Sequence, residues 1–180
     1  IAADQLVLSY YRSFDLPVSI IRPFNTFGPR QSLRAVIPTI ITQVLNGKKE
    51  INLGSTETRR DFTHAKDTAK GFVMALKSKN ISGEVINLGT GISFSIKEVI
   101  KIISEITGNK IKIKTDKKRL RPKKSEVSNL LSNNKKAKKL LKWKLKYNGK
   151  NGFKLAMRDT IEWFTKPKNL KLYDSSKYTV

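Results

Sequence analysis

The sequence predicts an α/β protein with a small α+β lobe, and two observations carry this prediction. Short apolar runs rich in β-branched residues alternate with segments whose apolar residues recur every three to four positions, so strands alternate with helices. The chain has 180 residues, 38% of them hydrophobic, which is enough to bury a core. We therefore expect strands covered by helices, with the α+β lobe in the last third of the chain.

The first third of the chain predicts helix, strand, helix and strand, in that order. Helical spacing of apolar residues begins at once over residues 1–14, without an initiator methionine, so we expect a chain cut from a longer protein. The run "LPVSIIRP", residues 16–23, is bounded by prolines and predicts a buried strand. A second helix is expected over residues 35–46 with Gly47 as its left-handed cap, and "EINLGS" is a short strand and turn.

The middle third predicts two helices around one strand. "RRDFTHAKDTAKGFVMALKS" begins with an extended piece and becomes helical from about Ala65, and the face expected to point inward carries Ala69, Phe72, Val73 and Leu76. "GEVINLGTG" is a strand followed by a glycine turn. Ser95 and Glu98 form a capping-box signature for a helix that ends at Gly108.

The last third predicts one strand, an exposed basic loop and two closing helices. "KIKIK", residues 110–114, alternates like a strand with one solvated face. Residues 116–125 are dense in Lys and Arg and are expected to form an exposed loop. Helices are expected over residues 134–141 and 151–164, the second with Phe153, Met157, Ile161 and Phe164 inward.

The formal net charge of +23 predicts attraction to polyanions, which include nucleic acid, acidic membranes and phosphorylated small molecules. The charge alone does not choose among these partners. Most of the excess is Lys scattered in pairs, and this pattern favours a solvated surface. A nucleic-acid partner is disfavoured, because no basic helix or aromatic stacking platform stands out.

Several classes of protein are disfavoured by composition. The chain has no cysteine, which argues against disulfides, thiolate nucleophiles and cysteine-based zinc sites and fits a reducing compartment. Metal chemistry is not expected. No apolar run approaches the roughly 18 residues of a membrane span, so we expect a cytoplasmic protein.

Groups suited to acid-base catalysis are scarce. His64 is the only histidine, and we expect it to be structural or exposed. Asp61 and Asp67 lie close to the start of the helix at Ala65, where carboxylates stabilise the helix dipole, so that role is preferred for both.

Anion-binding groups, in contrast, are abundant. Arginine presents a planar fork that suits phosphate, and three arginine-bearing loops follow apolar or extended runs, namely Arg22 to Arg30, Arg59 to Arg60, and Arg119 to Arg121. Ligands of α/β folds bind at loops after strands, so we hypothesise that these loops converge on one phosphate group. A nucleotide diphosphate suits this pattern better than DNA does.

Six motifs in order carry a family resemblance: "RPFNTFGPRQ", "VIPTII", "RRDFTHAKDTAKG", "VINLGTG", "RPKKSEV" and "NNKKAKKLLKW". Together they resemble the second half of extended short-chain dehydrogenase/reductases, the NAD-dependent nucleotide-sugar epimerase/dehydratase family. The wording is most similar to 4,6-dehydratases of nucleotide-linked N-acetylglucosamine in legionaminic-acid-type pathways, through "FNTFGPRQS", "RPKKSEV" and the ending "NLKLYDSSKYTV". The resemblance covers nearly the whole chain.

The resemblance implies a C-terminal part of a Rossmann-like enzyme with a substrate-binding lobe. Residues 1–34 would end the Rossmann core, residues 35–165 would form the lobe interleaved with the last core strand and helix, and residues 166–180 would be a tail, which has little periodicity. The glycine-rich NAD loop and the catalytic Ser/Thr and Tyr-x-x-x-Lys pair would precede Ile1. A homodimer is implied for the intact enzyme.

Site residues follow from the resemblance position by position. Pro23 and Phe24 resemble residues that approach the nicotinamide end of NAD. Asn25, Arg60 and Arg121 resemble residues that hold the substrate diphosphate. The resemblance also implies a base-binding wall made of Val36, Ile37, Asn52 and Leu53. Arg30 resembles a residue that reaches the substrate or the dimer partner. Glu126 resembles an acid that contacts the ribose. In many relatives this acid lies three residues after the second arginine, where this chain has Lys124, so Glu126 is expected to substitute for it.

The implied reaction oxidises sugar C4 with NAD, eliminates water across C5 and C6, and returns the hydride at C6. A 4-epimerase would share the first step and return the hydride at C4 from the other face. A polyanion-binding protein and a non-catalytic relative remain alternatives. We expect no turnover from these 180 residues alone.

Overall fold

The computed structural model describes residues 1–120 and 122–173. Its helices are α1 (Ala2–Phe14), α2 (Val36–Leu45), α3 (Ala65–Lys77), α4 (Ile96–Thr107), α5 (Lys135–Leu141), α6 (Gly149–Thr165) and α7 (Pro167–Leu170). Its strands are β1 (Ile20–Pro23), β2 (Asn25–Phe27), β3 (Glu50–Leu53), β4 (Arg59–Arg60), β5 (Phe62–His64), β6 (Val85–Leu88), β7 (Phe94–Ser95), β8 (Lys112–Thr115) and β9 (Asn129–Leu130). Two 3-10 turns, η1 (Lys117–Arg119) and η2 (Lys123–Ser125), lie in the loop between β8 and β9.

The strands form small, mostly parallel sheets that join distant parts of the chain. Parallel pairs connect β1 with β6, β2 with β5, and β3 with β8. In the three-stranded sheet, β4 lies between β7, which is antiparallel to it, and β9, which is parallel. Parallel pairs require crossover connections, and here helices and the long β8–β9 connection supply them.

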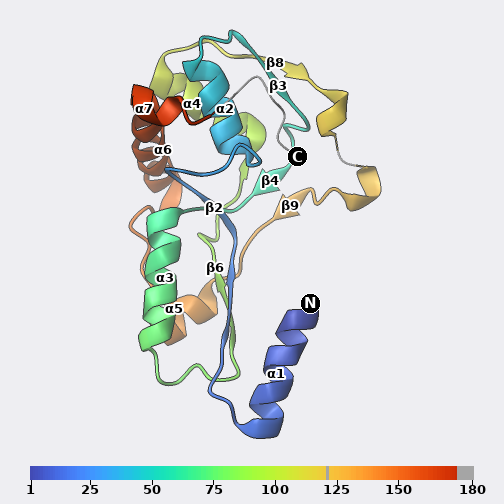
Figure 1. Cartoon of the computed structure of the whole chain (residues 1–180), viewed down its shortest axis with the longest axis vertical. Helices are drawn as coiled ribbons and strands as arrows, with labels where there is room; N and C mark the ends of the chain where they lie inside the picture. The colour runs from blue at the N-terminus through green and yellow to red at the C-terminus, as the bar shows by residue number, and fades with distance from the viewer. Residues whose placement is uncertain (121, 174–180) are drawn as a thin grey trace.

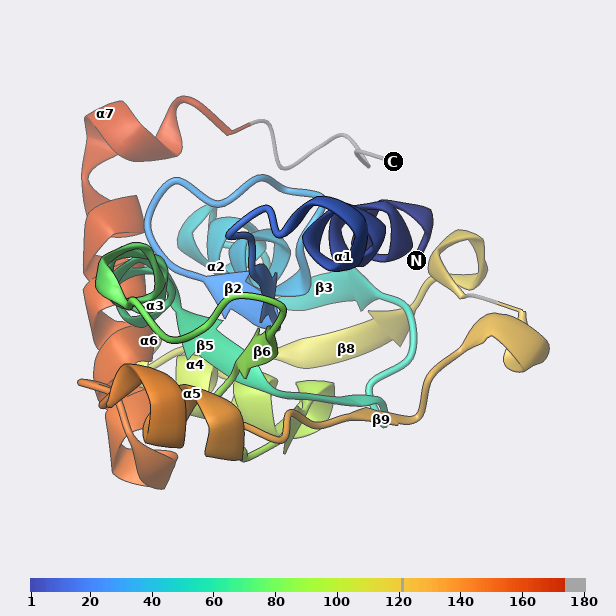
Figure 2. The ribbon, with the colours of Figure 1, turned by 90° about the horizontal axis from the view of Figure 1, so that it is seen from below.

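The elements separate into two levels (Figure 1). The upper level contains α2, α4, α6, β3 and β8, and the lower level contains α3, α5 and the β1–β6 pair. Seen from below, α3 lies to one side of this pair and α1 to the other (Figure 2). The strand β2 connects the levels, since it continues from β1 and pairs with β5.

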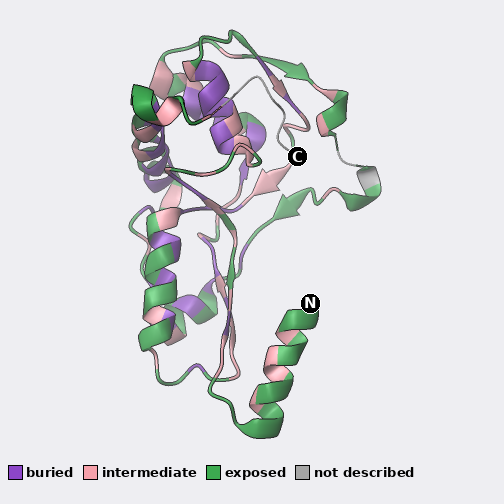
Figure 3. Ribbon diagram, in the orientation of Figure 1, coloured by how far each residue is buried: buried purple, intermediate pink, exposed green. Residues whose placement is uncertain are grey.

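Each level has its own hydrophobic cluster. In the upper cluster the rings of Phe94 and Phe153 stack with centroids 4.1 Å apart, and the apolar faces of α2, α4 and α6 pack around them. The lower cluster joins α3, α5 and β6 around Leu88 and the buried Trp143. The helices of both levels therefore carry buried residues, whereas α1 has none (Figure 3).

Most predicted helix boundaries are confirmed. Gly47 and Gly108 follow α2 and α4 with φ of 77° and 71°, the left-handed conformation that glycine adopts without strain. The capping box at α4 is complete, because the Ser95 hydroxyl accepts from the Glu98 N–H and the Glu98 carboxylate accepts from the Ser95 N–H. The four residues expected inward on α6 are all buried.

The inward face predicted for α3 is wrong. Ala69, Phe72, Val73 and Leu76 are exposed, and the buried residues are Asp67, Thr68, Gly71 and Ala75. The reason is close packing: a Cβ on Gly71 would lie 2.5 Å from Cδ1 of Leu88, so only the face of small residues can approach β6. Apolar periodicity alone predicts that the opposite face of α3 is buried.

The strand predicted over residues 110–114 is shifted and more exposed than expected. All four residues of β8 are exposed, because β8 pairs with β3 alone and lies at a sheet edge. The expected buried face is reduced to Ile111, which packs against the upper cluster just before the strand. The neighbouring loop is mostly exposed, as predicted.

His64 is structural, one of the two alternatives that the sequence left open. It ends β5, is 1% exposed, and caps α3 because its Nδ1 accepts from the N–H of Lys66. The neutral ring then carries its proton on Nε2, which lies 3.1 Å from Oδ2 of Asp159. Burial lowers the pKa of the imidazole, and the nearby carboxylate opposes this shift only in part.

Stability is therefore expected to depend on pH through His64. The unfolded chain binds a proton near pH 6.5, whereas the folded pKa is lower, so stability is complete above this pH and is lost as the pH falls. Urea unfolding at pH 8 and pH 5.5 measures the effect. His64→Phe removes the only histidine, so the free energy of unfolding of this variant should differ less between pH 8 and pH 5.5 than that of the wild type. A wild-type protein that is equally stable at both pH values would contradict this role.

None of the helices in the described ranges combines the length and apolar character that a bilayer crossing requires. Within the same residues, no three His, Cys, Asp or Glu side chains gather where they could bind a metal ion.

Candidate functional site

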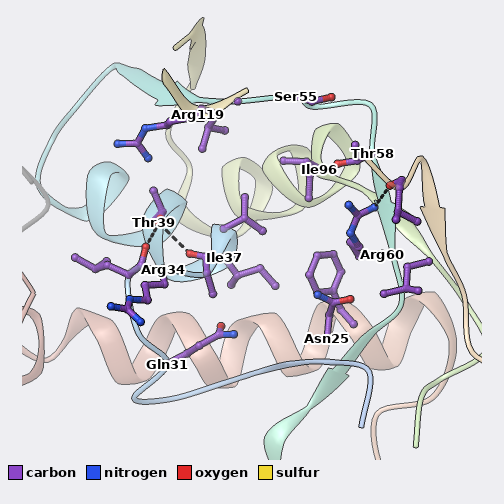
Figure 4. A pocket seen from close by; sticks show the side chains of 18 of the residues that line it. Asn25, Gln31, Arg34, Ile37, Thr39, Ser55, Thr58, Arg60, Ile96 and Arg119 are labelled. Atoms are coloured by element: carbon purple, nitrogen blue, oxygen red, sulfur yellow. Dashed lines mark hydrogen bonds between the residues drawn. The ribbon is translucent and has the colours of Figure 1, made fainter. Parts of the chain in front are cut away.

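A cleft of about 450 Å³ lies in the upper level, in the size range of small-molecule sites. Its walls come from β2, the loop that leads into α2, the start of α2, the β3–β4 connection and the segment before β9 (Figure 4). The cleft combines an apolar middle with cationic side chains. Its apolar lining includes Val36, Ile37, Leu53, Phe62 and Ile96.

Arg60 is a tightly held cation of the cleft, with a side chain that is 14% exposed. Its Nη1 donates to the carbonyl oxygens of Arg59 (2.8 Å) and Val127 (2.6 Å), and its Nη2 donates to Oε1 of Glu126 (2.8 Å). Three of the five guanidinium N–H donors are thus used. Among the described residues nothing accepts from the other two, Nε–H and one Nη2–H, which form a fork suited to a phosphate.

Asp61, next to Arg60, contradicts the predicted role in the helix dipole. It is fully buried and lies before β5 rather than on α3. Its carboxylate accepts from the N–H and hydroxyl of Thr90 (2.8 and 2.6 Å), the N–H of Gly91 (2.9 Å), and the N–H and hydroxyl of Ser132 (3.2 and 2.5 Å). Asp61 thus joins the β6–β7 turn to the segment after β9, and it fixes the backbone that presents Arg60.

Asp67 keeps only part of its predicted role. It lies in the first turn of α3, but its carboxylate is buried and accepts from the N–H groups of Lys146 (2.8 Å) and Tyr147 (3.0 Å). The acid therefore joins α3 to the connection between α5 and α6.

The structure brings six of the predicted substrate residues into the cleft: Asn25, Val36, Ile37, Leu53, Arg60 and Glu126. The Asn25 side chain makes no hydrogen bond to the described part of the chain. Glu126 pairs with Arg60, so its carboxylate already has a partner within the protein.

The other predicted site residues lie elsewhere. Pro23 is the last residue of β1 and is exposed, and Phe24 follows it and is half-buried. Arg30 is exposed with a φ of 68°, and the N–H of Asn52 donates to Oε1 of Gln43, which ties β3 to α2. Arg121 lies outside the described residues.

The expected convergence of three arginine loops on one site holds only in part. Arg22 pairs with Asp4 of α1, as expected of a structural residue, and neither it nor Arg30 lines the cleft. Arg59 leaves β4 away from the cleft and binds the carbonyl of Ser93 and the carboxylate of Glu98. Arg60 and Arg119 do line the cleft.

Sequence reasoning missed Arg34, which lines the cleft just before α2. The backbone on both sides of this residue is held by Thr39, whose hydroxyl lies 2.7 Å from the carbonyl oxygen of Leu33 and 2.9 Å from that of Ala35. The available signal was an arginine two residues before the apolar start of a helix. Among the described residues no side chain caps the N-terminus of α2, so the first N–H groups of this helix have no side-chain acceptor there.

On the opposite wall, Arg119 is positioned by a glycine. A Cβ on Gly54 would lie 2.4 Å from the carbonyl oxygen of Arg119, so η1 can lie against the end of β3 only because residue 54 has no side chain. The Nε of Arg119 also contacts Oδ2 of Asp116 at 3.2 Å. Both contacts hold this wall in place.

The sequence of the chain matches a known protein family. A family model described as GDP-mannose 4,6 dehydratase matches residues 1–156. This chain belongs to that family.

Individual relatives and solved structures are moderately similar to the chain. UDP-glucuronate 4-epimerase of Thermodesulfobacterium geofontis is 30% identical over 176 residues, which cover 97% of this chain and 51% of the relative. The dTDP-glucose 4,6-dehydratase of Bacillus anthracis, solved in complex with NAD, superposes with a TM-score of 0.79 at 29% identity, covering 93% of this chain and 50% of that one.

A third relative was solved in complex with a nucleotide-sugar. UDP-glucuronic acid 4-epimerase of Bacillus cereus, in complex with UDP-glucuronic acid and NAD, gives a TM-score of 0.81 at 27% identity, with 96% and 51% of the two chains covered. These superpositions confirm the predicted α/β fold of an extended short-chain dehydrogenase/reductase. The chain spans about half the length of these relatives.

Proposed function

We propose that these residues bind the diphosphate of a nucleotide-sugar, as part of an NAD-dependent nucleotide-sugar 4,6-dehydratase. The observation that carries the proposal is Arg60, whose guanidinium is fixed by three acceptors and lines a cleft together with the amide of Asn25, which pairs with none of the described residues. A pyrophosphate needs several such donors, and preorganised donors bind it without an ordering cost. The apolar residues Ile37 and Leu53 then cover the nucleoside, with Val36 at the helix start and Asn52 supporting β3.

The residues at the carboxyl end of β1 suit a contact with NAD. Pro23 and Phe24 lie at the carboxyl end of the β1–β6 pair, the edge where parallel α/β sheets bind ligands, and the exposed Pro23 offers an apolar contact for a nicotinamide. When bound, NAD supplies hydride transfer, so the proposed reaction oxidises sugar C4, eliminates water across C5 and C6 and returns the hydride at C6. In this proposal Asn25 and Arg60 hold the diphosphate, and Arg121 adds a second guanidinium.

Finer proposals rest on sequence motifs. "FNTFGPRQS" and "RPKKSEV" favour a dehydratase of nucleotide-linked N-acetylglucosamine, of the legionaminic-acid type. We further propose residues 35–165 as the main substrate-binding part, Arg30 as a residue that reaches substrate or partner, and a cytoplasmic homodimer. The exposed apolar residues Leu6, Tyr10 and Phe14 of α1 suit a contact with further protein.

A 4-epimerase is the second candidate, because the UDP-glucuronate 4-epimerase matches 97% of the chain. Both reactions use a nucleotide-sugar and begin with its oxidation at C4, so binding experiments do not distinguish a dehydratase from an epimerase. Product analysis of the complete enzyme separates them: a dehydratase releases a 4-keto-6-deoxy sugar, whereas an epimerase releases an isomer of the substrate.

We expect the 180-residue chain to bind nucleoside diphosphates and to leave the matching nucleotide-sugars unconverted. Calorimetric titration with UDP, dTDP and GDP measures binding. Product analysis after incubation of the nucleotide-sugars with NAD measures turnover, because the hydride returns to the sugar and no NADH accumulates. Binding should exceed that of the nucleoside monophosphates, because the second phosphate is the proposed ligand of Arg60. Binding only to DNA, with an affinity that collapses steeply with salt, would instead support the polyanion alternative.

A further inference from the structure

The lower level carries a lysine-rich surface that the proposed function does not use. Residues 127–158 contain no Asp or Glu, and eight of their lysines fall within residues 135–150, namely Lys135, Lys136, Lys138, Lys139, Lys142, Lys144, Lys146 and Lys150. All eight are exposed. The first four belong to α5, so the expectation that no basic helix stands out is wrong.

The fold keeps these lysines at the surface because the other side of the same segment is buried. In α5, Ala137 and Leu141 pack into the lower cluster, and after the helix the buried Trp143 has an exposed lysine on either side. The indole Nε1 of Trp143 donates to the carbonyl oxygen of Asp67 at 3.0 Å, which ties the segment to α3. The apolar side chains therefore face the protein, and the lysines remain in solvent.

Two lysines of α3 extend this surface. Lys70 and Lys77 lie on either side of Met74 at helical spacing, so the three residues share one stripe of the helix. Met74 packs against the lower cluster, which joins α3 to α5, and the two helices lie side by side in both views (Figure 1, Figure 2). Lys70 and Lys77 are exposed beside α5. We call these two and the eight lysines of residues 135–150 the lysine face.

The charge of the lysine face is mostly uncompensated within the protein. Among the described residues, Glu84 is the one acid that pairs with any of its members, through Lys136. None of the ten lysines lines the cleft, which lies in the upper level. Like charges at this density repel one another, so a partner of opposite charge would relieve the repulsion.

We propose that the lysine face docks on a membrane surface that carries anionic phospholipids. An ammonium group is a compact charge on a flexible stem, which suits mobile headgroups that offer no fixed geometry. A nucleic acid is a poorer fit, because the lysine face has no guanidinium fork for phosphates, and the aromatic residues of this segment, Trp143 and Tyr147, are buried and cannot stack on bases. The contact is electrostatic, since the apolar side of α5 is packed inside the protein and does not insert among acyl chains.

Flotation of the 180-residue chain with phosphatidylcholine vesicles, with and without phosphatidylglycerol, tests the proposal at physiological ionic strength. The chain should bind only the vesicles with phosphatidylglycerol, and added salt should release it. Replacing Lys135, Lys138 and Lys139 together by Gln should weaken this binding by at least about tenfold, because each lysine near an anionic surface adds to the attraction. Glutamine also has a high helix propensity, so α5 should stay folded.

The matched control replaces Lys97, Lys101 and Lys110 together by Gln. These lysines are exposed on or just after α4 in the upper level, so the control loses the same charge away from the lysine face. Its vesicle binding should fall by less than about threefold. Both triple variants should keep the urea midpoint of the wild type, because all six side chains lie at the surface.

A second variant of the lysine face, Lys144→Gln with Lys146→Gln, lies outside α5 and should also weaken vesicle binding, so the test does not depend on the helix alone. Equal losses in the α5 variant and the α4 control would overturn the proposal, because net charge would then explain the attraction. Wild-type binding that ignores phosphatidylglycerol would overturn it too. Tighter binding to duplex DNA than to vesicles at the same salt concentration, with the same loss in the α5 variant, would assign the lysine face to nucleic acid instead.

Discussion

Replacement of Asp61 by alanine is expected to lower the free energy of unfolding by about 3 kcal/mol or more, since each buried donor left without a partner costs about 1–3 kcal/mol. Five donors from Thr90, Gly91 and Ser132 point at this carboxylate, which has no exposed surface. Urea unfolding at pH 7.5 measures the loss.

Asp4→Ala is the matched control for Asp61. Asp4 of α1 pairs with Arg22 of β1 at the surface, so its replacement removes a carboxylate whose contact is solvated, and the expected loss of stability is below about 1 kcal/mol. The free energy of unfolding of Asp61→Asn should lie between those of the two alanine variants. The amide keeps one oxygen acceptor, but its NH2 group is a donor and lies next to other donors. If Asp61→Ala were no less stable than Asp4→Ala, the carboxylate would not be the link between the β6–β7 turn and the segment after β9.

Asp61 also shows what a local sequence pattern cannot predict. Its partners are 29 to 71 positions away, and their donors converge only after β4, β6 and β9 have been placed. A carboxylate four residues before a helix has a simple local explanation in the helix dipole, and that explanation is wrong here. Buried polar links between distant segments require the tertiary structure.

The helices were predictable where one broad apolar face meets the core. Residues such as Ile40 in α2, Ile103 in α4 and Met157 in α6 recur at helical spacing and are fully buried. The same reasoning selected the wrong face of α3, because the face that packs on Leu88 is made of small and polar residues. Periodicity detects apolar faces, whereas close approach of a helix to a strand is set by the absence of side-chain volume.

The cleft was predictable mainly through the family resemblance. Asn25 was assigned by that resemblance, and Arg60 was assigned both by it and as part of an arginine-bearing segment after an extended run; both line the cleft. Arg34 was not, because its position depends on the Thr39 hydroxyl, one turn into the following helix. The pairing of Glu126 with Arg60 likewise spans 66 positions, so spacing along the chain could not reveal it.

Arg60→Ala is expected to weaken UDP binding by about 100-fold, the largest loss of affinity from one side chain in this site. Hydrogen bonds to charged groups contribute about 1.5–3 kcal/mol each, and the Nε and Nη2 fork can donate two of them to a phosphate. Calorimetric titration of wild type and variant at the same ionic strength measures the ratio. Arg60→Lys should recover only a small part, because an ammonium group cannot reproduce the fork.

Arg59→Ala is a close control, because it removes the same charge from the adjacent position of β4. The Arg59 side chain binds Ser93 and Glu98 outside the cleft, so this variant should lose some stability and keep its affinity for UDP. Equal losses in the two variants would mean that net charge alone attracts the nucleotide. A loss of UDP affinity in Arg60→Ala but not in Arg59→Ala would show that the Arg60 guanidinium contacts the nucleotide directly. The difference between these neighbouring arginines therefore tests whether this strongly basic chain binds through one oriented guanidinium or through its overall charge.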